Sequence, residues 1–330
     1  MSNPAAETLV HSAFYRFVAL ADPAAVADAV RALAAAHRLQ GSILLAAEGI
    51  SGAVAGAPTA VAAFEAELQA LKVLVAVQAD VNLPASDPAA ERASQAALLG
   101  VRFKHSACLT EPFGRLKVSV KPEIVALALP AAENSMSALT ATATATASFT
   151  RAPSNRRLPL PDEQDDSHLS PPAWRELLAR QDLVLLDNRN HFEFRLGHFK
   201  GAVDPQIHHF RDFVAYVQAH APAWREAQRP VAMYCTGGVR CDKTAPWLRS
   251  LGLQVWQLDG GILNYFQSLD DAASDWTGDC FVFDNRLALN CALQETGASA
   301  EEVFDANRPD EAWRLQRAQR LQASGGCQDR

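Results

Sequence analysis

The sequence predicts an α/β protein with two domains, an α+β domain followed by a parallel α/β domain. Three features lead to this prediction. Residues 1–129 combine strands with helices that begin at proline, residues 130–168 are of low complexity, and residues 169–276 alternate short apolar strands with helices. A chain of 330 residues is long enough to bury two separate cores. Residues 277–330 are weakly patterned, and we treat them as a C-terminal extension.

The first domain is expected to place its helices on one face of a mainly antiparallel sheet, in a ferredoxin-like or acylphosphatase-like arrangement. Asp22 followed by Pro23 is typical of a helix start, and an alanine-rich stretch follows it. We expect strands at 14–20, 41–49 and from 51 to 56, helices at 23–40 and 58–71, an extended segment at 73–81 and an alternating segment at 114–127.

Residues 130–168 have a different composition from the segments on either side. The run "TATATATAS" at 140–148 is of low complexity, and "RAPSNRRLPLPDEQDDSH" after it is rich in proline and charge. Such composition is typical of a flexible linker or insertion rather than of a core element.

The second domain is expected to contain a parallel sheet covered on both faces. "SPPAW" at 170–174 indicates a helix start, and the apolar strand at 183–186 ends in Asp187. Further strands are expected in "GHFKGAVD" at 197–204 and at 229–235 and 253–261, and helices at 209–220, 243–251, 262–269 and, in the extension, 310–322. In sheets of this kind the reactive loop lies at the carboxyl end of a strand.

Composition excludes several classes of protein. The net charge is −7, so a nucleic-acid partner would need a local basic patch. The N-terminal residues do not resemble a signal peptide, and no apolar run approaches the length of a membrane span, so we expect a cytoplasmic protein without a membrane partner. The six cysteines are scattered and are expected to be reduced, and no CxxC or HExxH pattern indicates a metal site.

The glycine-rich turn "CTGGVRC" at 235–241 is the strongest candidate for a reactive site. Its glycines allow positive φ and let backbone N–H groups point inward, and such a nest before a helix binds anions. An anion site around Cys235 would stabilise its thiolate, and Arg240 adds a positive charge. The alternative is a structural turn around an inert, buried cysteine.

The length of this loop favours one kind of chemistry. Four residues, Thr236, Gly237, Gly238 and Val239, separate Cys235 from Arg240, whereas cysteine phosphatases have five. The smaller cradle is expected to suit a terminal sulfur or a small oxygen species better than a phosphate ester. Cys241 either resolves an oxidised Cys235 as a disulfide or simply packs in the helix.

The segments "LLDNRNHFEFRLGHFKGAVD", "YCTGGVRCDK" and "LDGGI" together resemble a rhodanese domain. The resemblance places Cys235 on the active-site cysteine of that family. Asp187, Arg189, Glu193 and His198 are then expected to be scaffold residues, with Arg189 and Glu193 forming a structural ion pair.

Across residues 11–290 the chain is similar to one narrower family, the rhodanese-domain tRNA uridine hydroxylases. The similarity rests on "FYRFVAL", "GSILLAAEGISGAVAG", "FKHS", "LKVSVKPEIV", "CTGGVRCDK", "LDGGILNY" and "WTGDCFVFDNR". It implies an oxidoreductase of monooxygenase type that uses molecular oxygen to convert the wobble uridine of tRNA to 5-hydroxyuridine. The sequence shows no signature of a flavin, haem or iron cofactor and does not identify the electron donor or an oligomeric state.

The chain departs from that family at three points. The linker at 130–168 is longer than usual, and Ser51 stands where asparagine is commoner. The C-terminal region has isolated Cys291 and Cys327 in place of paired cysteines, so no metal role is carried over to it.

A local basic cluster could bind the anticodon region of tRNA. Arg102, Lys104, Arg115, Lys117 and Lys121 lie close together in the sequence, against Glu111 and Glu123. The alternative is an ordinary solvated sheet face. Arg156 and Arg157 in the linker are weaker candidates. In "EGISG", Glu48 and Gly49 either contact the substrate or form a tight turn.

Two catalytic routes and two other functions remain open from the sequence. Either the thiolate of Cys235 adds to carbon 6 of uridine and makes carbon 5 enolate-like, or an oxidised Cys235 delivers the oxygen. The other functions are a sulfurtransferase that carries a persulfide on Cys235, and a non-catalytic tRNA-binding module.

Overall fold

A computed structural model of the chain describes residues 9–73, 98, 100–129 and 167–325. It contains two compact units, which are described separately. The first comprises residues 1–126 together with 281–330, and the second comprises residues 127–280. The predicted linker at 130–168, apart from its last two residues, and all but Val73 of the predicted extended segment at 73–81, lie outside the described residues.

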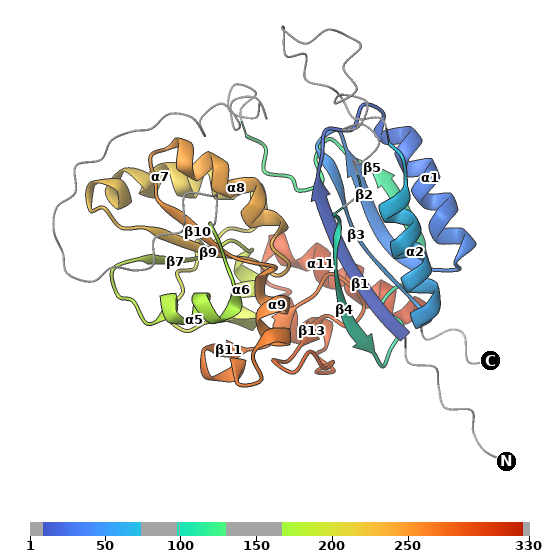
Figure 1. Cartoon of the computed structure of the whole chain (residues 1–330). Helices are drawn as coiled ribbons and strands as arrows, with labels where there is room; N and C mark the ends of the chain where they lie inside the picture. The colour runs from blue at the N-terminus through green and yellow to red at the C-terminus, as the bar shows by residue number, and fades with distance from the viewer. Residues whose placement is uncertain (1–8, 74–97, 99, 130–166, 326–330) are drawn as a thin grey trace, which may run out of the picture. The chain divides into compact units, whose positions relative to one another are not determined.

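The sheet of the first unit has the strand order β4-β1-β3-β2-β5 (Figure 1). The strands are β1 (Leu9–Phe17), β2 (Gln40–Ala46), β3 (Gly49–Gly56), β4 (Arg102–Cys108) and β5 (Leu116–Val120). All neighbours pair antiparallel except β2 and β5, which are parallel. The predicted mainly antiparallel sheet is therefore confirmed.

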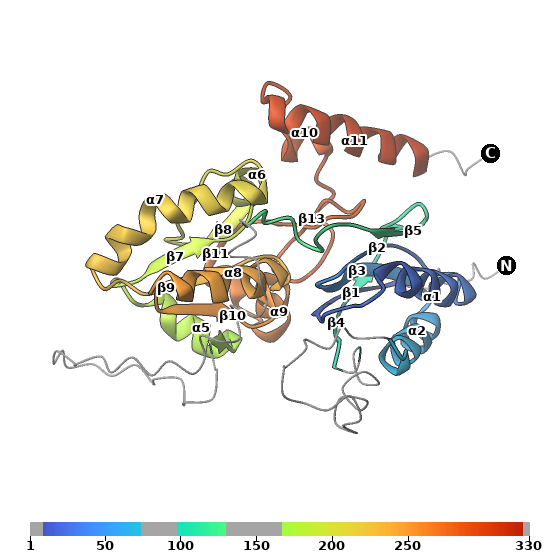
Figure 2. The ribbon, with the colours of Figure 1, turned by 90° about the horizontal axis from the view of Figure 1, so that it is seen from above.

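Two helices, α1 (Pro23–Ala36) and α2 (Pro58–Ala70), cover one face of this sheet (Figure 2). The carboxylate of Asp22 accepts hydrogen bonds from the N–H groups of Ala24 and Ala25, which satisfies the first turn of α1. Phe14, Ile43 and Ile50 from the strands pack with Val30 of α1 and Phe64 of α2 in one buried core. The first helix ends four residues before the predicted Gln40, because that residue begins β2.

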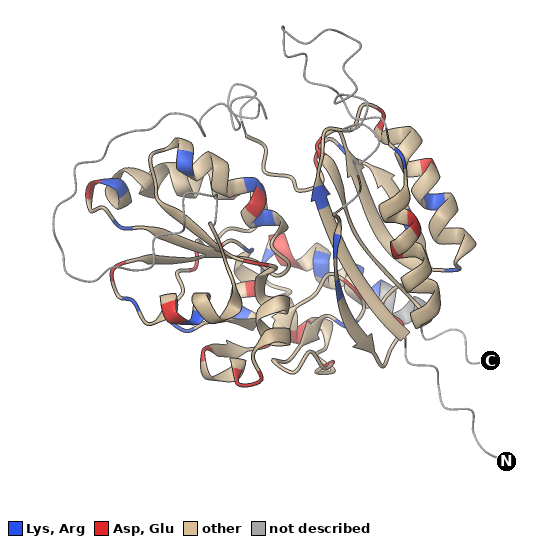
Figure 3. Ribbon diagram, viewed as in Figure 1, with Lys and Arg blue, Asp and Glu red and all other residues tan. Residues whose placement is uncertain are grey.

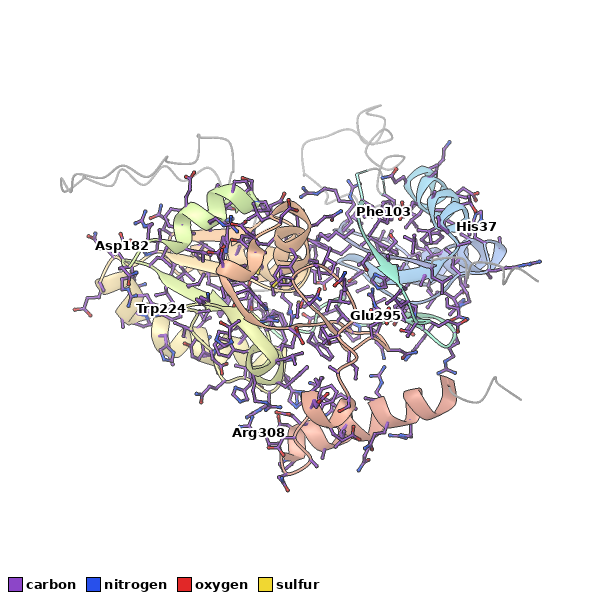
Figure 4. The ribbon with its side chains drawn as sticks, turned by 90° about the horizontal axis from the view of Figure 1, so that it is seen from below. His37, Phe103, Asp182, Trp224, Glu295 and Arg308 are labelled. Carbon is purple, nitrogen blue, oxygen red and sulfur yellow. The ribbon has the colours of Figure 1, made fainter. Side chains whose placement is uncertain are left out.

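The C-terminal residues belong to the same unit as the first sheet. They contain β13 (Ala288–Leu289), α10 (Ala300–Val303) and α11 (Pro309–Gly325), after β12 (Cys280–Phe281) at the boundary. Arg286 donates a hydrogen bond to the Ser106 hydroxyl on β4. Glu295, labelled in Figure 4, accepts hydrogen bonds from the N–H groups of Leu109 and Thr110, just after β4. The extension is thus a structural part of the N-terminal unit, a role that its weak pattern does not predict.

The second unit is built on a parallel sheet with the strand order β6-β10-β9-β7. One face packs on α7 and α8 through Val184, Val231 and Met233, and the other packs on α5 and α9 through an aromatic cluster around Tyr234. The elements are β6 (His168–Leu169), α5 (Pro171–Leu178), β7 (Val184–Asp187), α6 (His191–Leu196), β8 (Gly197–Phe199), η2 (Phe210–Asp212), α7 (Phe213–Glu226), β9 (Val231–Tyr234), α8 (Val239–Ser250), β10 (Val255–Leu258), α9 (Gly261–Ser268), η3 (Ala272–Ser274) and β11 (Trp276–Gly278). The predicted parallel sheet with helices on both faces is confirmed.

Several element boundaries differ from the prediction, and one strand was missed. Strand β1 begins at Leu9 rather than Phe14, because it pairs along its length with β3 and β4. Strand β4 was not predicted at all. Helix α8 begins at Val239 rather than Lys243, so Arg240 and Cys241 lie in its first turn. No helix of the described residues is long and apolar enough to cross a membrane.

Candidate functional site

The cysteine loop of the second unit lies between β9 and α8. Strand β9 ends at Tyr234, and Gly238 caps α8 with a φ of 98°, a left-handed conformation that favours glycine. The loop itself is therefore only Cys235 to Gly238. Its position, between the carboxyl end of a parallel strand and the N-terminus of a helix, is where backbone N–H groups and the helix dipole favour an anion.

The Cys235 side chain is fully buried and surrounded by hydrogen-bond donors. The Gly238 N–H donates to Cys235 Sγ at 3.1 Å. Burial by itself would raise the pKa of this thiol. The Cys241 side chain, the positive charge of Arg240 and the N–H groups of Cys241 and Arg240 outweigh burial and lower the pKa to about 6. The thiolate is therefore the main form of Cys235 at neutral pH.

Cys241 is the second thiol of the site, and its pKa is shifted in the opposite direction from that of Cys235. It is 1% exposed, and its pKa is raised well above the ordinary value by burial and by the neighbouring Cys235. The Asn188 amide donates to Cys241 Sγ at 3.8 Å. Cys241 thus stays protonated and donates its hydrogen to the Cys235 sulfur, and the two sulfurs are near neighbours.

Arg240 is held by a buried carboxylate. It donates to both oxygens of Glu193, from Nη1 and Nη2, at 2.7 Å each, and Nη2 also lies 3.3 Å from the Thr236 hydroxyl. Burial favours protonation of Glu193, but the charge and hydrogen bonds of Arg240 prevail and lower its pKa. The ion pair fixes the guanidinium beside the loop.

The predicted pair of Arg189 with Glu193 is wrong. Arg189 instead donates to both carboxylate oxygens of Asp187, at 2.8 and 2.6 Å, and to the Gly197 carbonyl. Glu193 is the third residue of α6, where its carboxylate accepts a hydrogen bond from the Asn190 N–H and reaches Arg240. His198 is a scaffold residue as expected, with Nδ1 at the Phe194 carbonyl and its ring stacked on Phe194.

The first turn of helix α9 holds the cysteine loop in place through backbone hydrogen bonds. The N–H groups of Ile262 and Leu263 donate to the carbonyls of Cys235 and Thr236 at 3.0 and 3.1 Å. Gly261 has a φ of 70°, and a Cβ atom there would clash with the Cys235 carbonyl oxygen and the Gly238 nitrogen. Sequence reasoning did not assign this role to "LDGG". The paired glycines before a helix were the available signal.

Two other buried cysteines show how burial changes the pKa of a thiol in this chain. Burial raises the pKa of Cys280 to about 12 and that of Cys108 to about 11. Cys235 is as buried as Cys280, yet its pKa moves the other way because the loop supplies donors. The site therefore has the properties of a nucleophilic or derivatised cysteine rather than of a packing residue. Among the described residues no group of three or more His, Cys, Asp or Glu side chains could hold a metal ion.

The residues of the predicted basic cluster lie in the other unit, but they do not form one cluster, because β4 and β5 are the two opposite edges of its sheet. Arg102 and Lys104 are on β4, Lys117 is on β5, and Arg115 and Lys121 flank β5. The strand register places Arg102, Lys104 and Lys117 on the sheet face opposite α1 and α2. Figure 3 shows lysine and arginine along β4. Arg156 and Arg157 lie outside the described residues.

The "EGISG" residues have clear structural roles. The Glu48 carboxylate accepts a hydrogen bond from the Ile124 N–H at 2.8 Å. Gly49 has a φ of 146°, and a Cβ atom there would clash with the Arg16 carbonyl oxygen. Gly49 thus has a structural role in the turn between β2 and β3, and Glu48 binds the segment that follows β5. A contact of either residue with the substrate stays a prediction.

Comparison with known proteins gives matches over most of the chain. Residues 9–124 match the UPF0176 acylphosphatase-like domain family, and residues 170–268 match the rhodanese-like domain family. A protein of Nitrobacter winogradskyi named tRNA uridine(34) hydroxylase is 37% identical, over 91% of this chain and 98% of its own. Proteins of the same name from Deinococcus radiodurans and Synechococcus elongatus are 35% and 36% identical, over 90% and 87% of this chain and 81% and 87% of their own.

Proposed function

The chain belongs to the tRNA uridine(34) hydroxylase family, and we propose that it hydroxylates carbon 5 of uridine 34 in tRNA with molecular oxygen. The main structural support for this chemistry is the pKa of the buried Cys235 thiol, which the surrounding donors lower to about 6. Family membership supports the substrate, because relatives of matching length share one name. A tRNA-modifying enzyme of this kind would act in the cytoplasm.

Cys235 is the reactive sulfur in this proposal. Carbon 5 of uridine is a weak nucleophile, and a thiolate bonded to carbon 6 would turn it into an enolate-like centre that attacks an electrophilic oxygen. In the second route, an oxidised derivative of Cys235 carries the oxygen to carbon 5. In both routes the N–H groups around Cys235 and the Arg240 charge stabilise a negative sulfur or oxygen.

Cys241, together with Cys235, can supply the two electrons that the hydroxylation needs in addition to those from uridine. Inserting one atom of molecular oxygen into the carbon–hydrogen bond leaves one atom to be reduced to water, which takes two electrons and two protons. Oxidation of the Cys235 and Cys241 thiols to a disulfide releases two of each, so uridine, oxygen and two thiols balance against 5-hydroxyuridine, water and one disulfide. The contact between the two side chains supports this role, and an external thiol would then reduce the disulfide.

The test is nucleoside mass spectrometry of total tRNA from a host that lacks its own wobble-uridine hydroxylation. The host expresses the wild type, Cys235→Ala, Cys241→Ala or Cys291→Ala. Cys291 is a partly exposed cysteine of the other unit and serves as the matched control. We expect 5-hydroxyuridine or its derivatives with the wild type and Cys291→Ala, and none with Cys235→Ala. Loss with Cys241→Ala would support the disulfide step.

One result would overturn the proposal. If the folded wild type forms no 5-hydroxyuridine, hydroxylation is not its activity. The buried anionic sulfur would then favour the rival function, a sulfurtransferase with a persulfide on Cys235. Transfer of sulfur from thiosulfate to cyanide by the purified chain, lost in Cys235→Ala, would establish that function.

A further inference from the structure

The sheet of the first unit has one face covered by helices and one that carries a different set of residues. Residues opposite each other on paired strands share a face, and faces alternate along each strand. The buried core residues Phe14, Ile43 and Ile50 define the face toward α1 and α2. Phe103, labelled in Figure 4, pairs with Phe14 and belongs to that side. The next residues in each strand therefore define the second face.

On the second face, the side chains of the two edge strands include cations, and no strand of the sheet contributes a carboxylate. One row across the sheet runs Lys104, Ala13, Ala53, Ser42, Lys117, and the neighbouring row runs Arg102, Tyr15, Ser51, Leu44, Ser119. None of the five described strands contains aspartate or glutamate, whereas the helices on the other face carry several, including Glu65 and Glu67. The negative charge of the chain is thus kept off these strands (Figure 3).

Two aromatic side chains of β1 lie beside the cations of the neighbouring strand β4. Tyr15 and Phe17 are partly exposed, and their rings contact each other edge to face with centroids 6.2 Å apart. The Lys104 ammonium lies 5.1 Å from the centre of the Tyr15 ring. An aromatic ring with a cation next to it can stack a nucleobase and bind the adjoining phosphate at the same time.

The C-terminal extension sets the limit of this face. His11 is on the same face as Tyr15, four residues earlier on β1, and is 6% exposed. Asp284 lies 3.4 Å from it, and Phe113 stacks on its ring at 5.7 Å. Asp284 of the extension and Phe113 of the segment between β4 and β5 therefore cover the His11 end of the sheet, and the aromatic pair lies toward the other end.

We propose that this face binds unpaired nucleotides of RNA, with Tyr15 and Phe17 stacking on bases and Arg102, Lys104 and Lys117 contacting phosphates. We name it the Tyr15 face. The proposal rests on the proposed function, because a wobble uridine lies in a single-stranded loop whose neighbouring bases can be splayed out. A duplex would offer the same phosphates but no accessible base faces, so the aromatic pair favours single-stranded RNA as the occupant.

The experiment measures equilibrium binding of the full chain to a seven-nucleotide single-stranded RNA and to an RNA duplex. The variants are Tyr15→Ala, Tyr15→Phe, Lys104→Ala and Lys117→Ala. The matched control is Lys72→Ala, an exposed lysine just after α2. We expect Tyr15→Ala to weaken single-strand binding about tenfold with little effect on the duplex, and Tyr15→Phe to bind as the wild type. Each lysine variant of the face should also lower the salt dependence by about 0.7 in the logarithmic slope, and Lys72→Ala should not.

The outcomes separate this proposal from the hydroxylase function. Equal binding by Tyr15→Ala and the wild type, or equal losses for duplex and single strand, would overturn base stacking on this face. As a check that needs no variant, RNA containing 5-iodouridine should cross-link on irradiation to the peptide with Tyr15 and Phe17, and cross-links confined to other peptides would also overturn it. Formation of 5-hydroxyuridine by the wild type is measured separately, so its absence would remove the hydroxylase function without deciding RNA binding.

Discussion

Cys235 shows how hydrogen-bond donors can reverse the effect of burial on one side chain. Cys235 and Cys280 are both fully buried, and desolvation pushes the pKa of either thiol upward. Cys235 receives an N–H hydrogen bond from Gly238 and a thiol hydrogen from Cys241, and its pKa falls instead. Because these donors come from a loop of four residues and the first turn of a helix, the reactivity of the thiol depends on backbone geometry.

The first prediction concerns the pH dependence of this thiol. Since the thiolate is the nucleophile, the rate of Cys235 alkylation by iodoacetamide should rise with pH and level off above an inflection near 6. Cys241→Ala removes a donor to the thiolate, so its inflection should move to higher pH. Mass spectrometry of the Cys235 peptide gives the rates, and the Cys291 peptide is the internal reference. An inflection near the ordinary thiol value of 9.0 in the wild type would contradict the lowered pKa.

Residue-level reasoning from the sequence singled out the Cys235 loop but not the carboxylate that binds Arg240. The strand, glycine-rich turn and helix order around Cys235 is a local pattern, so it could be predicted. Glu193 and Arg240 are 47 positions apart, and nothing local distinguishes Arg240 from Arg189 as the partner. That choice is made by packing, because α6 presents Glu193 to the loop while Arg189 reaches back to Asp187.

At the level of elements, α9 holds the shape of the cysteine loop through backbone contacts. Two N–H groups at its start bind two loop carbonyls, and this close approach leaves no room for a Cβ atom at Gly261. Gly201 offers a matched comparison in the same unit. It has a similar φ of 79°, but a Cβ atom there would meet no described atom within 4 Å beyond its chain neighbours.

The second prediction compares alanine at these two glycines. Gly201→Ala should cost only the strain of a positive φ, about 1 kcal/mol. Gly261→Ala adds the clash with the loop, so its free energy of unfolding should fall by about 1–3 kcal/mol more, and 5-hydroxyuridine formation should be lost. Urea unfolding followed by tryptophan fluorescence reports mainly on the second unit, which contains five of the six tryptophans of the chain, Trp174, Trp224, Trp247, Trp256 and Trp276. Equal stability and activity of the two variants would mean that the loop tolerates the displacement.

Elements with a strong local pattern were the ones that could be predicted. Helices α1 and α2 start at proline, and β7 and β9 are apolar runs, so each was expected near its observed place. Strand β4, "RFKHSAC", was missed because both of its faces carry polar residues. His105 and Ser106 are accommodated only by tertiary contacts, with Glu65 of α2 and with Arg286 respectively.

At the scale of the whole chain, the first unit includes residues that follow the second unit in the sequence. Arg286 binds both carboxylate oxygens of Asp284, at 2.9 and 2.8 Å, and reaches Ser106 and Cys108 on β4. Arg286 and Ser106 are 180 positions apart, and such a contact leaves no periodic signal in the sequence. This is why the domain order could be predicted while the place of the extension could not.

The buried cluster of His11, Asp284 and Arg286 makes the first unit sensitive to acid. Burial and the neighbouring Arg286 lower the pKa of His11 to about 4, from an ordinary value of 6.5. Between these values the unfolded chain binds a proton that the folded chain does not, so the free energy of unfolding falls as pH decreases from about 6.5 to 4. The shift corresponds to at most about 3 kcal/mol. Asp284 does not reverse this effect, because its carboxylate already binds Arg286.

The third prediction is that acid will destabilise the first unit more than the second. Hydrogen exchange resolved by peptide should show β1 and β4 losing protection between pH 6.5 and 4, after correction for the intrinsic pH dependence, more than α8 does. His11→Asn replaces the imidazole with an amide that does not titrate, so the first unit of this variant should lose less protection over the same interval, whatever its stability at neutral pH. Identical pH dependence in the wild type and His11→Asn would show that His11 is not the titrating group. The comparison with α8 separates this effect from general acid unfolding, because that helix lies in the unit that lacks His11.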